Sequence, residues 1–283
     1  MTPLVAAAVL AAAVTHASWN AIAHGIRDQL LAFTLVSSGG LLCGLGMAAV
    51  APLPAAGAWP YLIASAVLHI AYQALLMRSF RLGDFGQMYP IARGTAPLVV
   101  TVLAAVFVHE RPDGWQTAGV ALASAGLVGL ALWGIRGSGA RPHWAALTAA
   151  VATGLAIAAY TVVDGVGVRA SGTSIGYIGW LMILEGFVIP AYALATRGRA
   201  LGAQLRPVAV RGLAGGVLSV SAYGLVLWAQ TRAQLAPIAA LRESSIIVGA
   251  AIGALFFKER FGTVRIAAAG LMVAGIGLML HAG

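Results

Sequence analysis

Long apolar runs, separated by short polar stretches, are the dominant pattern along this chain of 283 residues. Each run is about 20 residues long, the length of an α-helix that crosses the hydrocarbon core of a bilayer. The pattern predicts ten spanning helices, at residues 3–24, 29–51, 58–78, 87–108, 114–135, 143–164, 173–195, 208–230, 236–257 and 262–281. The loops between them are too short to form a soluble domain. We therefore expect the functional residues to lie within the spans.

The chain also repeats part of itself. Pro90-Ile91-Ala92 recurs as Pro237-Ile238-Ala239, and at a constant offset of 149 the residues Arg93, Glu110-Arg111 and Gly126 recur as Arg242, Glu259-Arg260 and Gly275. Internal duplication in a polytopic chain is typical of secondary transporters. We predict an all-α integral membrane fold of two five-helix repeats, residues 1–138 and 139–283. Because five is an odd number, the second repeat enters the membrane inverted, and a site between the halves can open to either side in turn.

Composition supports a membrane location. The chain is 60% hydrophobic and 9% charged, which leaves too little polar surface for a soluble domain of this size. A net charge of +9 would suit nucleic-acid binding in a soluble protein, but 15 of the 17 Lys and Arg residues lie between the predicted spans. Basic residues between spans set the orientation of a protein in the membrane, so we expect no nucleic-acid partner. The single Cys43 allows no intramolecular disulfide, and no metal site or cofactor is predicted.

Basic residues predict the orientation. Twelve of those between spans lie in odd-numbered loops, and only Arg111, Arg169 and Arg232 lie in even-numbered ones. The positive-inside rule then places both termini on the periplasmic side of a bacterial inner membrane. The first apolar run has no basic segment before it and no small-residue cleavage site after it, so we interpret it as a retained span. Small residues spaced as in Gly40 and Gly44, or Gly119 and Ala123, fit packing within the bundle or a homodimer face, and both monomer and homodimer stay open.

Two motifs carry a family resemblance. They are Tyr89-Pro90-Ile91-Ala92-Arg93-Gly94-Thr95-Ala96-Pro97 with His109-Glu110-Arg111, and Ala236-Pro237-Ile238 with Lys258-Glu259-Arg260. Over its whole length the chain resembles the EamA-type branch of the drug/metabolite transporter superfamily. The resemblance implies ten spans and small organic solutes, such as amino acids, other metabolites or organic cations, usually moved outward. Related four-helix multidrug exporters use a first-span glutamate, but this chain has His16 and Asn20 there, so that mechanism does not transfer directly.

The fourth span carries a polar stripe. Tyr89, Arg93 and Pro97 are four residues apart and therefore share one helical face. Pro97 has no amide hydrogen, which leaves the carbonyl of Arg93 without its usual helical donor. The planar fork of Arg93 suits a carboxylate. The alternative is a structural pairing of Arg93 with Glu185, Asp164 or a helix end.

Aromatic and amide side chains mark the third and eighth spans. His69, Tyr72 and Gln73 share a face of the third span, and Tyr223 is the repeat counterpart of Tyr72. A tyrosine offers a flat apolar face and one hydroxyl, which suits the wall of a solute pocket. An interfacial belt or simple packing is the alternative.

The first and sixth spans are predicted to frame the same cavity. The first places His16, Trp19, Asn20 and His24 at helical spacing, and the sixth ends with Tyr160 and Asp164. We expect Trp19, Asn20 and Tyr160 to contact solute. His24 and Asp164 lie near predicted span ends, where an interfacial position is the alternative.

Arg242 and Glu243 place a base and an acid at the start of the ninth span. Consecutive residues on a helix diverge by about 100°, so we expect them not to pair with each other. Glu243 replaces Gly94 of the first repeat, and it or Glu185 of the seventh span could carry a coupled proton. Structural pairing with Arg93 or Arg242 is the other interpretation. For Glu110-Arg111 and Glu259-Arg260 we expect capping and loop anchoring.

The sequence thus predicts an inner-membrane secondary transporter, an exporter of small organic solutes such as amino acids or related metabolites. Its partners would be the solute and membrane lipids. A multidrug or organic-cation exporter and a flippase-like carrier of a lipid-linked headgroup are the alternatives. No enzyme is predicted, since the chain has no His-Glu-x-x-His or Gly-x-Ser-x-Gly motif and no cysteine cluster.

Overall fold

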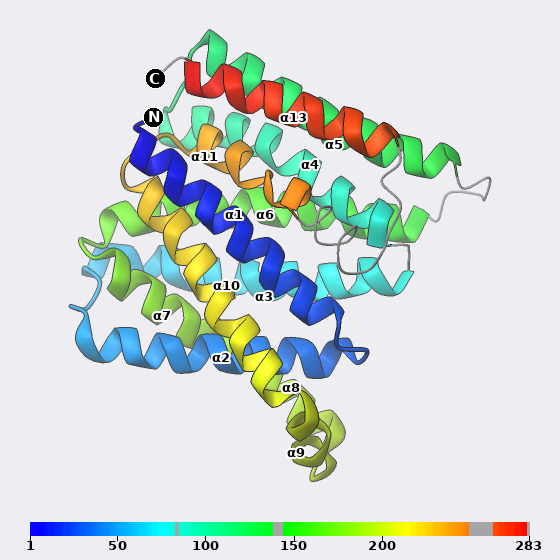
Figure 1. Cartoon of the computed structure of the whole chain (residues 1–283). Coiled ribbons are helices and arrows are strands. Elements are labelled where there is room, and N and C mark those ends of the chain that lie inside the picture. Colours follow the sequence, from blue (N-terminus) through cyan, green and yellow to red (C-terminus); the bar gives the residue numbers. More distant parts are fainter. Residues whose placement is uncertain (83–84, 138–143, 249–262, 282–283) are drawn as a thin grey trace.

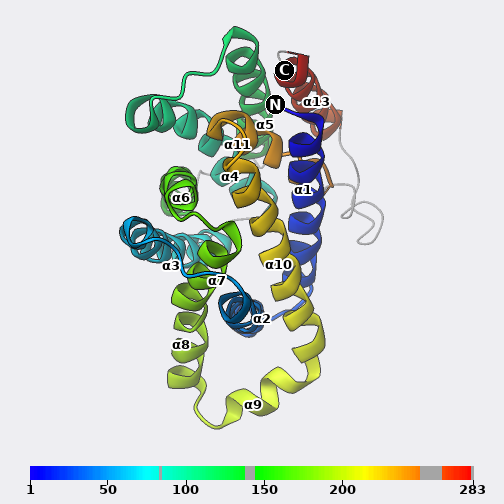
Figure 2. The same ribbon diagram turned by 90° about the vertical axis from the view of Figure 1, so that its left-hand side faces the viewer.

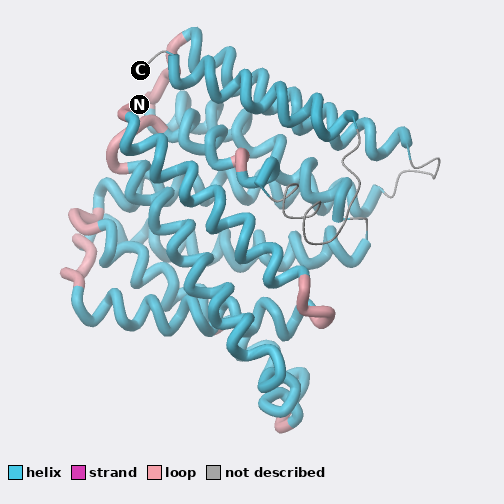
Figure 3. Tube along the Cα trace, in the orientation of Figure 1, coloured by secondary structure: helices cyan, strands magenta, loops and turns pink. Residues whose placement is uncertain are grey.

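The computed structural model describes residues 1–82, 85–137, 144–248 and 263–281, and every regular element within them is a helix (Figures 1 and 3). The α-helices are α1 (Pro3–His24), α2 (Gln29–Val50), α3 (Trp59–Leu82), α4 (Phe85–Leu103), α5 (Gly114–Gly137), α6 (Trp144–Ala170), α7 (Ser174–Gly186), α8 (Val188–Arg197), α9 (Ala200–Leu205), α10 (Ala209–Gln230), α11 (Leu235–Arg242) and α13 (Thr263–His281). Short elements are the 3₁₀ turns η1 (Ala56–Ala58) and η3 (Arg206–Val208) and the π-helical turn η2 (Ala104–Val108).

Six helical segments of this described part are long and apolar enough to cross a membrane. They are Pro3–Ala23, Gln29–Val50, Ala56–Arg78, Leu147–Ala170, Ser174–Arg197 and Ala200–Gln230. Shorter apolar segments cover Arg93–Val108 and Ile266–His281. Large apolar side chains also point outward, as at Phe107 and Val210, which are 71% and 83% exposed. Apolar surface of this kind suits lipid rather than water, so the chain is a multi-pass helical membrane protein.

Polar residues at the loop ends start several of these helices. Thr2, Asp28 and Thr173 are the N-caps of α1, α2 and α7, and their side-chain oxygens accept hydrogen bonds from first-turn amides. Such bonds satisfy donors that have no partner within the helix. The observed starts therefore fall within one residue of the predicted ones at 3, 29 and 173.

Two predicted spans are broken instead of continuous. The segment predicted at 173–195 forms α7 and α8 with Phe187 between them, because Pro190 has no amide hydrogen for the carbonyl of Gly186. The segment predicted at 236–257 is helical as α11 only to Arg242, and a turn follows at Glu243. Residues 249–257 lie outside the described part.

The helices pack side by side, with α5 and α13 at one end of the molecule and α8 and α9 extending from the other (Figures 1 and 2). The termini lie near each other. Several helix pairs approach closely at glycines: a Cβ atom on Gly119 of α5 would lie 2.5 Å from the carbonyl oxygen of Gly275 in α13, and one on Gly44 of α2 would lie 2.8 Å from that of Gly179 in α7. Gly44 and Gly119 therefore allow close packing of helices within the bundle.

Candidate functional site

Four side chains from three helices form a buried cluster that we call the charged centre: His16 of α1, Arg93 of α4, and Arg242 and Glu243 at the end of α11. Arg93 Nη1 donates to Glu243 Oε1 at 3.2 Å, and Arg93 Nη2 contacts His16 Nε2. Arg93 and Arg242 are 3% and 4% exposed, and Glu243 is fully buried. The structure thus brings together residues 150 positions apart. It shows the structural pairing considered for Glu243, with Arg93, and Glu243 was not among the partners expected for Arg93.

Arg242 retains hydrogen-bonding capacity. Its Nε lies 3.6 Å from Glu243 Oε1, beyond hydrogen-bond distance, and its buried Nε and Nη2 have no hydrogen-bond partner. The hydroxyls of Ser244 and Ser245 and Glu243 Oε2 are also buried without one. A separation of 3.6 Å is still within ion-pair distance, so our expectation that Arg242 and Glu243 do not pair was wrong. The reason is that α11 ends at Arg242, so the 100° spacing of a continuous helix does not apply to Glu243.

The charged centre carries an excess positive charge. Its two guanidinium groups and one carboxylate sum to a formal charge of +1 when His16 is neutral. A buried charge is costly unless it is paired and hydrogen-bonded. One anionic group would balance the charge, and a carboxylate could accept hydrogen bonds from the unpartnered atoms of Arg242.

The other first-span candidates surround His16. Trp19 Nε1 donates to His16 Nδ1 at 3.2 Å, and the two rings meet edge to face at 5.2 Å between centroids. The side-chain amide of Asn20 donates to the main-chain carbonyl of His16 at 2.8 Å. These contacts position His16 against Arg93. The side chain of His24 lies outside the described residues.

A second group, the aromatic cluster, consists of His69 and Tyr72 of α3, Tyr160 of α6 and Tyr223 of α10. His69 stacks on Tyr160 with ring centroids 4.0 Å apart, and Tyr223 lies 5.3 Å from His69. Tyr72 meets Tyr160 edge to face at 5.5 Å. Tyr72, Tyr160 and Tyr223 also pack around Ala96, one turn beyond Arg93 on α4. The aromatic residues predicted for the pocket wall therefore come together beside the charged centre.

Asp164 lies under the aromatic cluster and is fully buried. Its carboxylate accepts hydrogen bonds from the hydroxyl of Tyr177 at 2.8 Å and from that of Tyr223. The structure places Asp164 in the interior of the helix bundle, and α6 continues six residues beyond it, to Ala170. Sequence reasoning missed Tyr177, since nothing in its spacing indicates a bond between α6 and α7.

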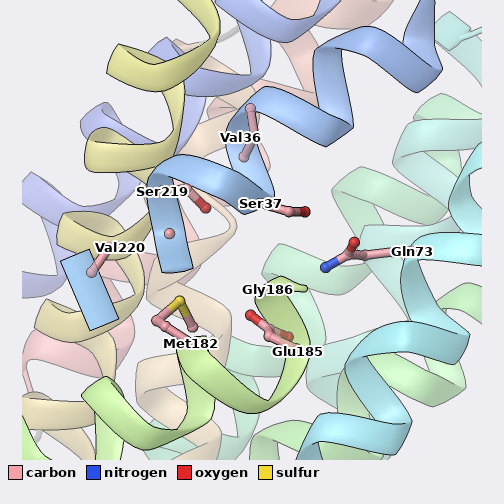
Figure 4. Close-up of a pocket in the computed structure, with 9 residues that line it drawn as sticks. Val36, Ser37, Gln73, Met182, Glu185, Gly186, Ser219 and Val220 are labelled. Atoms are coloured by element: carbon pink, nitrogen blue, oxygen red, sulfur yellow. The ribbon is translucent and has the colours of Figure 1, made fainter. Parts of the chain in front are cut away.

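A small cavity of about 40 Å³ lies between α2, α3, α7 and α10 (Figure 4). Its polar side chains are Ser37, Gln73, Glu185 and Ser219. Glu185 Oε2 is buried without a hydrogen-bond partner and lies 3.9 Å from His69 Nδ1. Gln73 and Glu185 were predicted from the sequence, whereas the two serines were not, because serine is common in spans as a helix-packing residue.

Some predicted residues fall elsewhere. The side chain of Tyr89, and Lys258-Glu259-Arg260 as a whole, lie outside the described residues. Glu110 has the capping role expected of it: it pairs with Arg169, and its Oε2 accepts from the amide of Leu235 at the start of α11 at 2.7 Å. Among the described residues, no group of three or more His, Cys, Asp or Glu side chains is placed to hold a metal ion.

Comparison with known proteins gives the fold alone. No protein-family model matches the chain, and no curated protein is similar to it. A solved structure, described only as "Crystal structure of protein", superposes with a TM-score of 0.77 at 13% identity. The match covers 100% of this chain and 99% of the other. At this identity the match supports a shared helical architecture, and it carries no information about function.

Proposed function

We propose that this chain is an inner-membrane secondary transporter that exports a small organic solute bearing a carboxylate, such as an amino acid, by alternating access. The observation that carries the proposal is the charged centre, where Arg242 offers two buried donors without partners at a break in α11. Broken helices lining a central site are a feature of secondary transporters, and intramembrane ionisable residues usually mark a transport pathway. The proposal includes ten spans and membership of the drug/metabolite transporter superfamily.

The helix contacts support two related halves. In this relation α1 corresponds to α6, α2 to α7 with α8, α3 to α10, α4 to α11, and α5 to α13. Exchanging the halves then converts the pair α1·α10 into α6·α3, and the pair α4·α6 into α11·α1. All four of these pairs are in contact. The pairs α2·α7, α4·α11 and α5·α13, also in contact, each join a helix to its own counterpart. A two-fold axis between the halves produces this pattern, as inverted repeats require.

The contacts of α5 with α13 support the same relation at the level of residues. A Cβ atom on Gly275 would lie 2.6 Å from the carbonyl oxygen of Gly119, and one on Gly126 would lie 2.9 Å from that of Ala268. With the offset of 149, Gly119 corresponds to Ala268 and Gly126 to Gly275. Exchanging the halves therefore converts one contact into the other, which favours two equivalent conformations.

Uptake of labelled amino acids into proteoliposomes, with and without a proton gradient, tests the proposal. We expect wild-type flux and a loss of at least about tenfold in Arg242→Met, because a charge-assisted bond to the solute is removed. Arg232→Met is the matched control, since Arg232 is exposed and lies over the ring of Trp228. Flux driven by the proton gradient would favour Glu243 or Glu185 as the coupling acid. Equal flux in wild type and Arg242→Met would contradict the role of the charged centre.

A further inference from the structure

The Glu185 cavity is a polar space between the described helices, and its polar side chains are Ser37, Gln73, Glu185 and Ser219. None of these residues belongs to the charged centre. We propose that the cavity binds the primary ammonium group of the transported solute, an inference that rests on the proposed function. The inference rests on the carboxylate of Glu185, because this side chain is only 10% exposed and its Oε2 has no hydrogen-bond partner.

The nearest basic group does not satisfy Glu185. His69 Nδ1 lies 3.9 Å away, which is too long for a hydrogen bond. The same nitrogen lies 3.0 Å from the carbonyl oxygen of Ser65. A carbonyl only accepts, so Nδ1 directs its hydrogen toward Ser65, and that hydrogen is not donated to Glu185. The described residues that line the cavity include no Lys or Arg. A buried carboxylate in this setting needs a proton or a cation.

The remaining lining favours an ammonium group. Figure 4 shows the side chains of Ser37, Gln73 and Glu185 turned toward the same space. Ser219 from α10 adds a hydroxyl to the lining. An –NH₃⁺ group has three donors, which match one carboxylate oxygen and two of the neutral oxygens. The Gln73 amide can present its oxygen, since its orientation follows the ligand.

Size restricts the ligand further. A volume of about 40 Å³ has room for only a few groups the size of water. The end of an aliphatic amine fits that space, whereas a quaternary ammonium with four methyl groups does not. The helix break after Gly186 gives α7 an end at the cavity. Broken helices of this kind line solute sites in transporters.

The location agrees with the rest of the proposed site. His69, whose Nδ1 lies 3.9 Å from Glu185 Oε2, belongs to the aromatic cluster. That cluster packs against α4 at Ala96, one turn from Arg93. A solute that carries its amine and its carboxylate at opposite ends could then place the carboxylate at Arg242, its chain along the tyrosines and its ammonium at Glu185. The substrate class is a small solute with a primary amine and a carboxylate.

Thermal shift of the purified full-length protein with methylammonium chloride tests the inference directly. Tetramethylammonium and sodium chloride at the same concentration are the comparisons. We expect methylammonium alone to raise the melting temperature of wild type, and Glu185→Gln to weaken the apparent affinity at least about tenfold. Asp113→Asn is the matched control, because Asp113 is an exposed acid at the start of α5.

Three outcomes would overturn the assignment: no methylammonium effect, an equal effect in Glu185→Gln, or an equal effect of sodium or tetramethylammonium. Ser219→Ala, a smaller change, guards against misfolding of Glu185→Gln and should weaken binding as well. Amino-acid flux in proteoliposomes separates the two proposals. Flux that is unaffected by Glu185→Gln would leave the transporter standing without the ammonium site, and methylammonium binding without any flux would leave the site standing without the transporter.

Discussion

Replacing Glu243 by glutamine should destabilise the fold strongly, because it leaves two buried guanidinium groups without their carboxylate. The attraction between Arg93 and Glu243 across 3.2 Å is about 5 kcal/mol at an effective dielectric constant of about 20. Arg242 adds a second attraction across 3.6 Å. Desolvation cancels part of these terms. Breaking a buried pair by removing one partner typically costs about 3–5 kcal/mol, and we expect a loss in that range.

The assay is thermal melting of the purified variants in one detergent, followed by tryptophan fluorescence. Glu243→Gln should melt well below wild type. The double variant Arg93→Met, Glu243→Met should recover much of the loss, because it removes the pair together and leaves only Arg242 charged. Arg242→Met should lower the melting temperature least of the three variants, since it keeps the ion pair of Arg93 and Glu243, whose charges cancel.

A Glu243→Gln variant that melts like wild type would refute the reasoning. It would mean that Glu243 is already protonated in the resting protein and that the guanidinium groups are compensated by other means. A double variant less stable than Glu243→Gln alone would also contradict the reasoning. The double variant has one unpaired guanidinium group fewer, so unpaired charge could not then be the cause of the lost stability.

Other changes test separate parts of the molecule. Gly119→Val should push α5 from α13 and lower the melting temperature, because its Cβ would lie 2.5 Å from the carbonyl oxygen of Gly275; Gly277→Val on α13, with nothing within 4 Å, should be tolerated. Arg169→Ala should expose the ends of α10 and α11 to limited proteolysis, since Arg169 donates to main-chain carbonyls there as well as to its acidic partner. Asp164→Asn should lower stability and solute affinity, measured by melting and binding, because one of its two tyrosine donors must then face an amide donor.

The positions of the helices were largely predictable from the sequence. Apolar runs of spanning length and polar residues at their ends set helix starts such as those of α1, α2 and α7 within one residue. These signals are local, and a membrane strengthens them because a spanning helix must satisfy its own backbone. Helix breaks were harder to predict. Pro190 was visible in the sequence, whereas the turn at Glu243 has no proline or glycine beside it to indicate a break.

The candidate residues were predictable by type, but their partners were not. Ionisable and aromatic residues in apolar spans singled out Arg93, Tyr72 and Glu185. Their contacts join segments far apart in the chain, so they depend on how the helices pack. Asp164 shows the difference. Its position near a predicted span end suggested an interface, whereas the longer α6 carries it into the core between Tyr177 and Tyr223.

The excess charge at Arg242 follows from the point at which the two repeats differ. Arg93 and Arg242 occupy equivalent positions, but Glu243 corresponds to Gly94. A Cβ atom on Gly94 would lie 2.7 Å from the Cβ of Leu127 in α5, so α4 has no room there for a second acid. Two equivalent arginines therefore share one carboxylate. The backbone of the halves can be nearly symmetric, as alternating access requires, while the side chains leave one guanidinium to be neutralised by a solute. Gly94→Ala should crowd α5 without changing this charge balance. Ser245→Asp adds a second acid three residues after Arg242, at a buried hydroxyl without a hydrogen-bond partner, and should compete with a solute carboxylate and lower uptake without lowering the melting temperature.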